Sequence, residues 1–146
     1  MNAGDLFADF ENIDIANLLI NIDSDVGVLY GDCDVLFENK YRLYKRSGVK
    51  ISERNMMPFC HQSAFTRTNL VRRFKFDTQF PRVADQKLYL QLYLEDVKFK
   101  YSPLLFSIVE AEGFSSKNLL LTLKEELELR LDFGLISKWQ LKVIYF

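Results

Sequence analysis

The chain has 146 residues and a hydrophobic fraction of 49%, which predicts one packed domain and argues against disorder. The formal net charge of −1 argues against a generally basic nucleic-acid-binding protein. Apolar runs are only a few residues long and Met1 leads into an acidic stretch, so neither a transmembrane helix nor a signal peptide is expected. Two cysteines, Cys33 and Cys60, and one histidine exclude a disulfide scaffold and a multi-histidine metal site, and favour a reducing, cytoplasmic setting.

Hydrophobic periodicity and turn residues predict a mixed α and β order, without the regular alternation of a self-sufficient doubly wound sheet. In chain order, the expected elements are a helix over 10–22, a buried strand over 26–37, a loop over 45–58, helices over 63–74 and 85–95, a strand over 99–109, a helix over 118–133 and a short final helix over 137–146. The first strand carries a turn at Gly31-Asp32, after which a second strand can follow. The 118–133 helix has a leucine stripe at 120, 123, 127 and 131 and stops at Gly134. That stripe either packs in the core or docks a partner helix.

The charges are segregated along the chain. Residues 1–39 hold nine acids and no Lys or Arg, whereas residues 40–75 hold ten bases against Glu53 alone. Blocks of opposite sign can place a cation site beside an anion site, as an enzyme that handles a metal-bound phosphate needs. Two solvated surfaces that face each other in the fold would give the same pattern.

The basic block at 40–75 also contains aromatic residues, among them Tyr41, Tyr44, Phe59 and Phe65. This mixture is compatible with a non-catalytic binding or interaction module, since single-stranded nucleic acids bind such surfaces. However, no RNA-binding signature or helix-turn-helix spacing is present, and the acidic first block would repel a polyanion. No nucleic-acid partner is therefore expected.

Five short segments contain the residue types that chemistry needs. They are Asn2-Ala3-Gly4-Asp5, Tyr30-Gly31-Asp32, Cys60-His61-Gln62, Val83-Ala84-Asp85 at a helix start, and Glu112-Gly113-Phe114-Ser115-Ser116 after a strand. Together with Phe76-Asp77 and the 98–101 strand, their order over nearly all of residues 1–118 resembles the latter half of a family 2 glycosyltransferase of the GT-A type, as found in bacterial exopolysaccharide and colanic-acid clusters. The resemblance implies an α/β fold, mixed α+β here, with 1–118 as the acceptor-side half of the catalytic domain and 119–146 as a C-terminal helical extension.

The same resemblance implies an inverting transfer of a sugar from a nucleotide-diphosphate sugar to a saccharide or lipid-linked acceptor in surface polysaccharide synthesis. The protein would be cytoplasmic, in peripheral contact with the inner membrane face. A divalent metal, Mg or Mn, would hold the donor pyrophosphate, and Asp5 matches the acid of the metal motif. Asn2 and Gly4 stand where that motif has further acids. From the residues alone, the favoured interpretation of Asp5 is a turn residue after Gly4 or a cap of the helix that follows.

Asp85 matches the general base of similar enzymes, which removes the proton of the acceptor hydroxyl. This chemistry needs an ionised carboxylate within hydrogen-bond reach of the acceptor. A helix N-terminus favours the ionised form, and Asp85 opens a predicted helix. The alternative is an ordinary N-cap, although Leu88 stands where a capping box would have Glu or Gln.

The resemblance places five further residues near the substrates. His61 and Gln62 would lie beside the donor and acceptor pocket, where His61 donates to an oxygen and Gln62 orients a hydroxyl. Asp32 would line the acceptor side, or be a turn carboxylate. Gly113 and Ser115 resemble a Gly-x-Ser turn near the donor phosphates, or Ser115 caps a helix. The two cysteines are interpreted as small buried residues.

Similar enzymes begin with a Rossmann-like half that binds the nucleobase and ribose, whereas Met1 here falls inside the segment that resembles the metal motif. On this resemblance the N-terminal half is expected to be missing. The chain alone, as a fragment or a truncated inactive transferase, is then expected neither to bind donor sugar appreciably nor to transfer it. Apolar surface and sheet edges left uncovered would favour a homo-oligomer.

Overall fold

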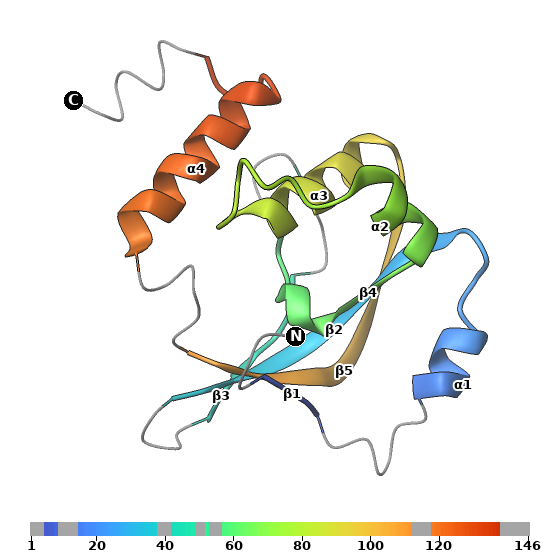
Figure 1. Cartoon of the computed structure of the whole chain (residues 1–146). Coiled ribbons are helices and arrows are strands. Elements are labelled where there is room, and N and C mark those ends of the chain that lie inside the picture. The colour runs from blue at the N-terminus through green and yellow to red at the C-terminus, as the bar shows by residue number, and fades with distance from the viewer. Residues whose placement is uncertain are drawn as a thin grey trace.

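The computed structural model describes residues 5–8, 15–37, 42–48, 52, 57–111 and 118–137. These residues form a mixed α/β fold around one sheet (Figure 1). In chain order, its elements are β1 (Leu6–Phe7), α1 (Ile15–Ile20), β2 (Val26–Leu36), β3 (Arg42–Lys45), the 3₁₀ helix η1 (His61–Ser63), β4 (Ala64–Thr66), α2 (Thr68–Phe74), α3 (Ala84–Leu94), β5 (Lys98–Glu110) and α4 (Leu119–Asp132). No described helix has the length and apolar character that crossing a bilayer requires.

The long strand β2 is the centre of the five-stranded sheet. It pairs in parallel with β5 along nearly its whole length. On its other edge, its first half pairs antiparallel with β4 and its second half with β3. Strand β1 pairs antiparallel with β5, at Leu6↔Ile108 and Phe7↔Ser107. The first strand of the described chain is thereby paired with the last one, β5.

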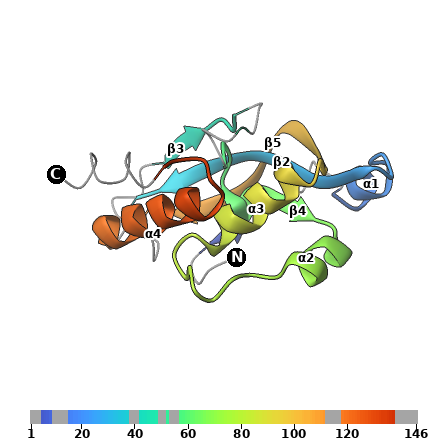
Figure 2. The same cartoon turned by 90° about the horizontal axis from the view of Figure 1, so that it is seen from above.

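The core lies between the sheet and the helices α2 and α3, which cover one face of it (Figures 1 and 2). Val28 and Tyr30 of β2 pack there with Leu88 and Leu92 of α3 and with Phe59. The Tyr30 and Phe59 rings stack with their centroids 4.5 Å apart. Because successive side chains of a strand point to opposite faces of the sheet, Val28 and Tyr30 lie on one face of β2, and this face forms the apolar layer against which α3 packs.

Helix α4 packs beside α3 through Leu129, on the side of α3 that faces away from α2 (Figures 1 and 2). Leu129 is 0% exposed and lies among Phe80, Val83 and Leu90. Of the predicted leucine stripe, Leu120 is 80% exposed, so core packing of that part of the stripe is wrong. The stripe does not predict the contact, because α4 packs against α3 through its second half, where Leu129 lies.

The predicted turn at Gly31-Asp32 is wrong, because β2 continues through it to Leu36. A Cβ atom on Gly31 would lie 2.6 Å from the Leu104 carbonyl oxygen and 2.7 Å from the Phe106 ring. The glycine therefore marks a close approach between strands rather than a turn. The pairing of β2 with β5 is also irregular on both sides of Asp32.

The predicted helix over 63–74 is wrong in its first half. There the chain forms η1 and then β4, and α2 begins only at Thr68. Phe65 pairs with Leu29 of β2, so a non-local strand ladder overrides the helical pattern.

The helices over 85–95 and 118–133 and the strand over 99–109 are confirmed, as α3, α4 and β5. Gly134 has φ +68° and ends α4 as predicted, with Leu135 N–H donating to the Arg130 carbonyl at 2.8 Å. Helix α1 confirms the predicted 10–22 helix over Ile15–Ile20, and residues 21 and 22 are not helical. The start of that helix, over 10–14, and nearly all of the predicted final helix over 137–146 lie outside the described residues.

Several large apolar side chains near the start of the chain are exposed. Leu6 and Phe7 of β1 and Ile20 of α1 are more than half exposed. Such a surface is of the kind expected to favour self-association, and the homo-oligomer stays a prediction.

Candidate functional site

The turn of η1 positions the candidate site, because its last residue is anchored in the sheet. Ser63 is buried and its Oγ donates to the Asp32 carbonyl oxygen at 2.9 Å. The Ser63 hydroxyl also hydrogen-bonds the Ser107 hydroxyl of β5. With Ser63 tied to both central strands, the two preceding residues, His61 and Gln62, are held at fixed positions above the sheet.

His61 and Asp85 form a close pair. His61 Nδ1 lies 2.7 Å from Asp85 Oδ2, and the other carboxylate oxygen accepts the Gln86 N–H at 2.9 Å. Val83 is the N-cap of α3, so Asp85 lies inside the first turn and the N-cap alternative is wrong. The Asp85 and His61 side chains are 20% and 37% exposed, which leaves the pair accessible to a substrate.

The environment raises the pKa of His61. Burial disfavours the charged imidazolium, but the hydrogen bond from the ring to Asp85 and the negative charge of that carboxylate outweigh it. His61 therefore holds its proton to a higher pH than a free histidine and forms a charged pair with Asp85 when it does.

The His61–Asp85 pair should make stability pH-dependent. Because the pKa of His61 is raised on folding, its stabilising contribution is fully present below about pH 6.5, the unfolded value, and is lost as pH rises through the folded value. We expect the unfolding free energy of wild type to exceed that of His61→Gln by more at pH 5.5 than at pH 9, in urea titrations.

The exposed pair Arg73–Glu95 supplies the control, because it is an ion pair that contains no histidine. Arg73→Gln should cost the same small amount at both pH values. A His61→Gln cost that grows toward pH 9 would contradict the raised pKa.

Gln62 and Asp5 form a second pair beside the first. Gln62 Nε2 donates to Asp5 Oδ2 at 3.1 Å, and Asp5 Oδ1 accepts the Glu110 N–H at 3.4 Å. The pairing of β1 with β5 brings Asp5 to this place. Two consecutive residues, His61 and Gln62, thus hold the two predicted carboxylates, Asp85 and Asp5, at one turn of the chain.

Asp5 does not make a metal site by itself. Among the described residues, no three His, Cys, Asp or Glu side chains gather in a group that would hold a metal ion. Asn2 and Gly4 of the predicted motif lie outside the described residues. The described residues therefore do not fit a self-contained Mg or Mn centre, which would need several further oxygen ligands.

Asp32 is an internal anchor. It is 1% exposed, and its carboxylate accepts hydrogen bonds from the Tyr44 hydroxyl, from Ser47 N–H at 2.7 Å and from the Tyr101 hydroxyl at 2.9 Å. The bond to Asp32 raises the pKa of Tyr44 to about 12. The turn-carboxylate alternative is wrong, because Asp32 lies within β2. Its carboxylate joins β3 and β5 to β2, and a role beside the acceptor stays a prediction.

Gly113 and Ser115 lie outside the described residues. The Arg67 guanidinium donates to the Val26 carbonyl at 2.6 Å and to the Asp23 carbonyl at 3.2 Å. The described bases of the 40–75 block fall into two groups, at β3 and around α2, which lie at different ends of the fold in both views (Figures 1 and 2).

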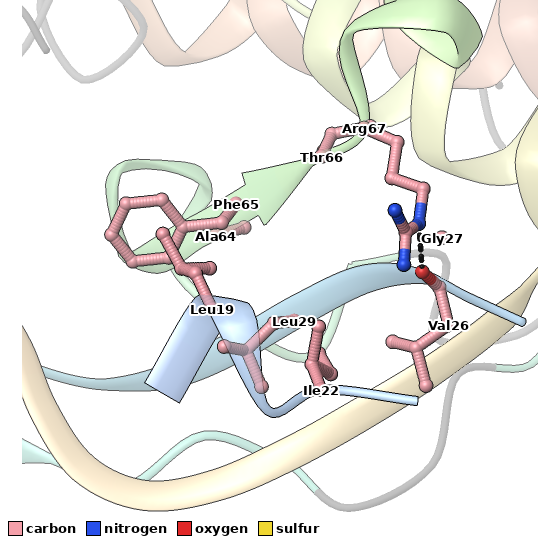
Figure 3. Close-up of a pocket in the computed structure, with 9 residues that line it drawn as sticks. All are labelled: Leu19, Ile22, Val26, Gly27, Leu29, Ala64, Phe65, Thr66 and Arg67. Atoms are coloured by element: carbon pink, nitrogen blue, oxygen red, sulfur yellow. Dashed lines mark hydrogen bonds between the residues drawn. The ribbon is translucent and has the colours of Figure 1, made fainter. Parts of the chain in front are cut away.

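A hollow of about 390 Å³ lies between α1, β2 and β4 (Figure 3). Leu19 and Ile22 come from the α1 side, Leu29 from β2 and Phe65 from β4, with Arg67 at one end. None of the predicted site residues that the structure describes lines this hollow. Its lining is mainly apolar, so it offers little to a charged sugar nucleotide.

Cys60 belongs to this site, which the sequence did not predict. Its Sγ donates to Gln62 Oε1 at 2.8 Å, and the Cys33 thiol hydrogen-bonds it from β2. The only indication in the sequence was its place directly before His61.

No protein-family model matches the chain, and the search of curated proteins finds no similar sequence.

Proposed function

We propose that the chain is the acceptor-side part of an inverting glycosyltransferase. Its substrates would be a nucleotide-diphosphate sugar and a saccharide or lipid-linked acceptor, at the cytoplasmic face of the membrane. The observation that carries the proposal is that two consecutive residues of η1 each hold one of the predicted carboxylates. His61 contacts Asp85 at 2.7 Å, and Gln62 contacts Asp5 at 3.1 Å. The order of the sequence motifs supports the same function.

In this proposal Asp85 is the general base. As the acceptor oxygen attacks the anomeric carbon, its proton passes to the Asp85 carboxylate, while the bond from that carbon to the nucleoside diphosphate breaks. A single displacement inverts the configuration and needs no protein nucleophile. His61 orients the carboxylate through Oδ2, and Gln86 N–H fixes Oδ1.

Asp5 is proposed to face the donor side. A bound Mg or Mn would neutralise the leaving diphosphate, and Asp5 would be one of its ligands, with the others supplied from outside the described residues. Gln62 holds Asp5 in place through its amide.

The proposal is tested by incubating the chain, alone and within a longer polypeptide that adds a Rossmann-like nucleotide-binding half, with a panel of nucleotide-diphosphate sugars and saccharide acceptors. We expect the longer polypeptide to release nucleoside diphosphate and to form a product of inverted anomeric configuration by NMR, and the chain alone to do neither. Chelation with EDTA should abolish release, and added Mn²⁺ should restore it. A retained configuration, or no transfer in either form, would reject the proposal in favour of an inactive transferase or a binding module.

A further inference from the structure

The two cysteines meet at the base of the candidate site. Cys33 is buried on β2, and Cys60 is the partly exposed residue before η1. The bond from Ser63 Oγ to the Asp32 carbonyl holds η1 against this part of β2. The Cys33 and Cys60 thiols are in hydrogen-bond contact as a result.

Hydrogen bonds connect this thiol pair to the candidate site. Cys60 Sγ donates to Gln62 Oε1 at 2.8 Å, and the amide nitrogen of the same side chain donates to Asp5 at 3.1 Å. Cys60 thereby sets the orientation of the Gln62 amide, because an amide whose oxygen accepts from the thiol must present its nitrogen to Asp5.

The two thiols also differ in reactivity. Three neighbours lower the pKa of Cys60 to about 7, against the effect of burial. They are the hydrogen bond from Cys33, the backbone N–H of Gln62 and the nearby His61 ring. The same contact and burial raise the pKa of Cys33. Cys60 is therefore the thiolate that attacks an oxidant, with Cys33 directly beside it.

We propose that Cys60 and Cys33 are an oxidation site, at which hydrogen peroxide or another two-electron thiol oxidant forms a disulfide between β2 and η1 and removes the Cys60 donor from Gln62. The Cys60 thiolate takes one oxygen from peroxide and becomes a sulfenic acid, releasing hydroxide. The Cys33 sulfur then attacks the Cys60 sulfur, and the oxygen leaves as water. In sum, two thiols and one peroxide give one disulfide and two waters.

The disulfide is tested on the whole chain by treating reduced protein with peroxide at pH 7, denaturing it, and measuring intact mass and alkylatable thiols. We expect wild type to lose two hydrogens and both alkylatable thiols, and to recover both with dithiothreitol. Native protein should react about tenfold faster than urea-unfolded protein, in line with the larger thiolate fraction of Cys60.

Two variants separate the roles of the thiols. Cys33→Ser should accumulate a dimedone-reactive sulfenic acid at Cys60, whereas Cys60→Ser should leave the buried Cys33 unmodified. The inference is overturned if native wild type keeps two free thiols, reacts no faster than the unfolded chain, or forms disulfides only between chains.

The link to the candidate site has its own readouts, and only the activity readout depends on the proposed function. In ¹⁵N–¹H spectra the Gln62 side-chain amide signals should shift on oxidation and return on reduction, and an unchanged signal would reject the link while the disulfide stands. Sugar transfer should fall on oxidation and recover with dithiothreitol. If the reduced protein transfers no sugar even within the longer polypeptide, the proposed function fails, and the mass measurement still decides whether the disulfide forms.

Discussion

Asp85→Asn is expected to reduce the rate of sugar transfer by about 10²–10⁴-fold, the range that general-base catalysis contributes. Asparagine has nearly the same shape and can still hydrogen-bond His61, but its amide cannot take up the proton of the acceptor hydroxyl. The rate of nucleoside diphosphate release at saturating donor and acceptor measures this effect. The unfolding midpoint should change little by comparison, because the His61 contact lies at a partly exposed position.

Asp77→Asn is the matched control. Asp77 lies in the loop before α3 and pairs with Lys87 Nζ of that helix at 2.7 Å, so the same substitution breaks an ion pair to α3 without touching the candidate site. We expect its transfer rate to stay close to that of wild type, because this partly buried ion pair lies outside the candidate site. Equal rates for wild type and Asp85→Asn would show that Asp85 is not the general base. An equal loss in Asp85→Asn and Asp77→Asn would indicate that both substitutions perturb α3.

The parts of the fold that sequence predicted are those whose pattern is local. Helix α3 and strand β5 carry their periodicity within a dozen residues, and Gly134 ends α4 through its own backbone conformation. Strands β3 and β4 were missed because each is only a few residues long and is stabilised by its ladder with β2. The sequence of such a short segment does not indicate the strand with which it pairs.

The candidate site shows the same division. Sequence motifs and their order singled out Asp85, His61 and Gln62, but only the folded chain reveals which side chains pair: His61 with Asp85, and Gln62 with Asp5. Asp32 was misinterpreted as a turn residue because Gly-Asp favours turns, while its true setting depends on hydroxyls from two other strands. Neither type of contact leaves a periodic pattern in the chain.

Leu129→Ala is expected to lower the unfolding free energy by about 2–5 kcal/mol, the usual cost of truncating a fully buried leucine. Leu129 is the one fully buried side chain among the described residues of α4, and it fills the space between Phe80, Val83 and Leu90. Alanine would leave a cavity there, since the Glu125 side chain also holds α4 against the loop before α3, by accepting the Arg82 backbone N–H at 2.8 Å. Urea titration followed by far-ultraviolet circular dichroism measures the loss.

Leu120→Ala is the matched control for that measurement, because it is the same substitution on the same helix. At 80% exposed, Leu120 has little contact to lose, and leucine and alanine both favour helix, so we expect a change within about 0.5 kcal/mol. The comparison separates burial from helix propensity. Equal costs at the two positions would mean that α4 docks through its leucine-rich first turn, which would restore the predicted stripe at 120, 123, 127 and 131 as the packing face.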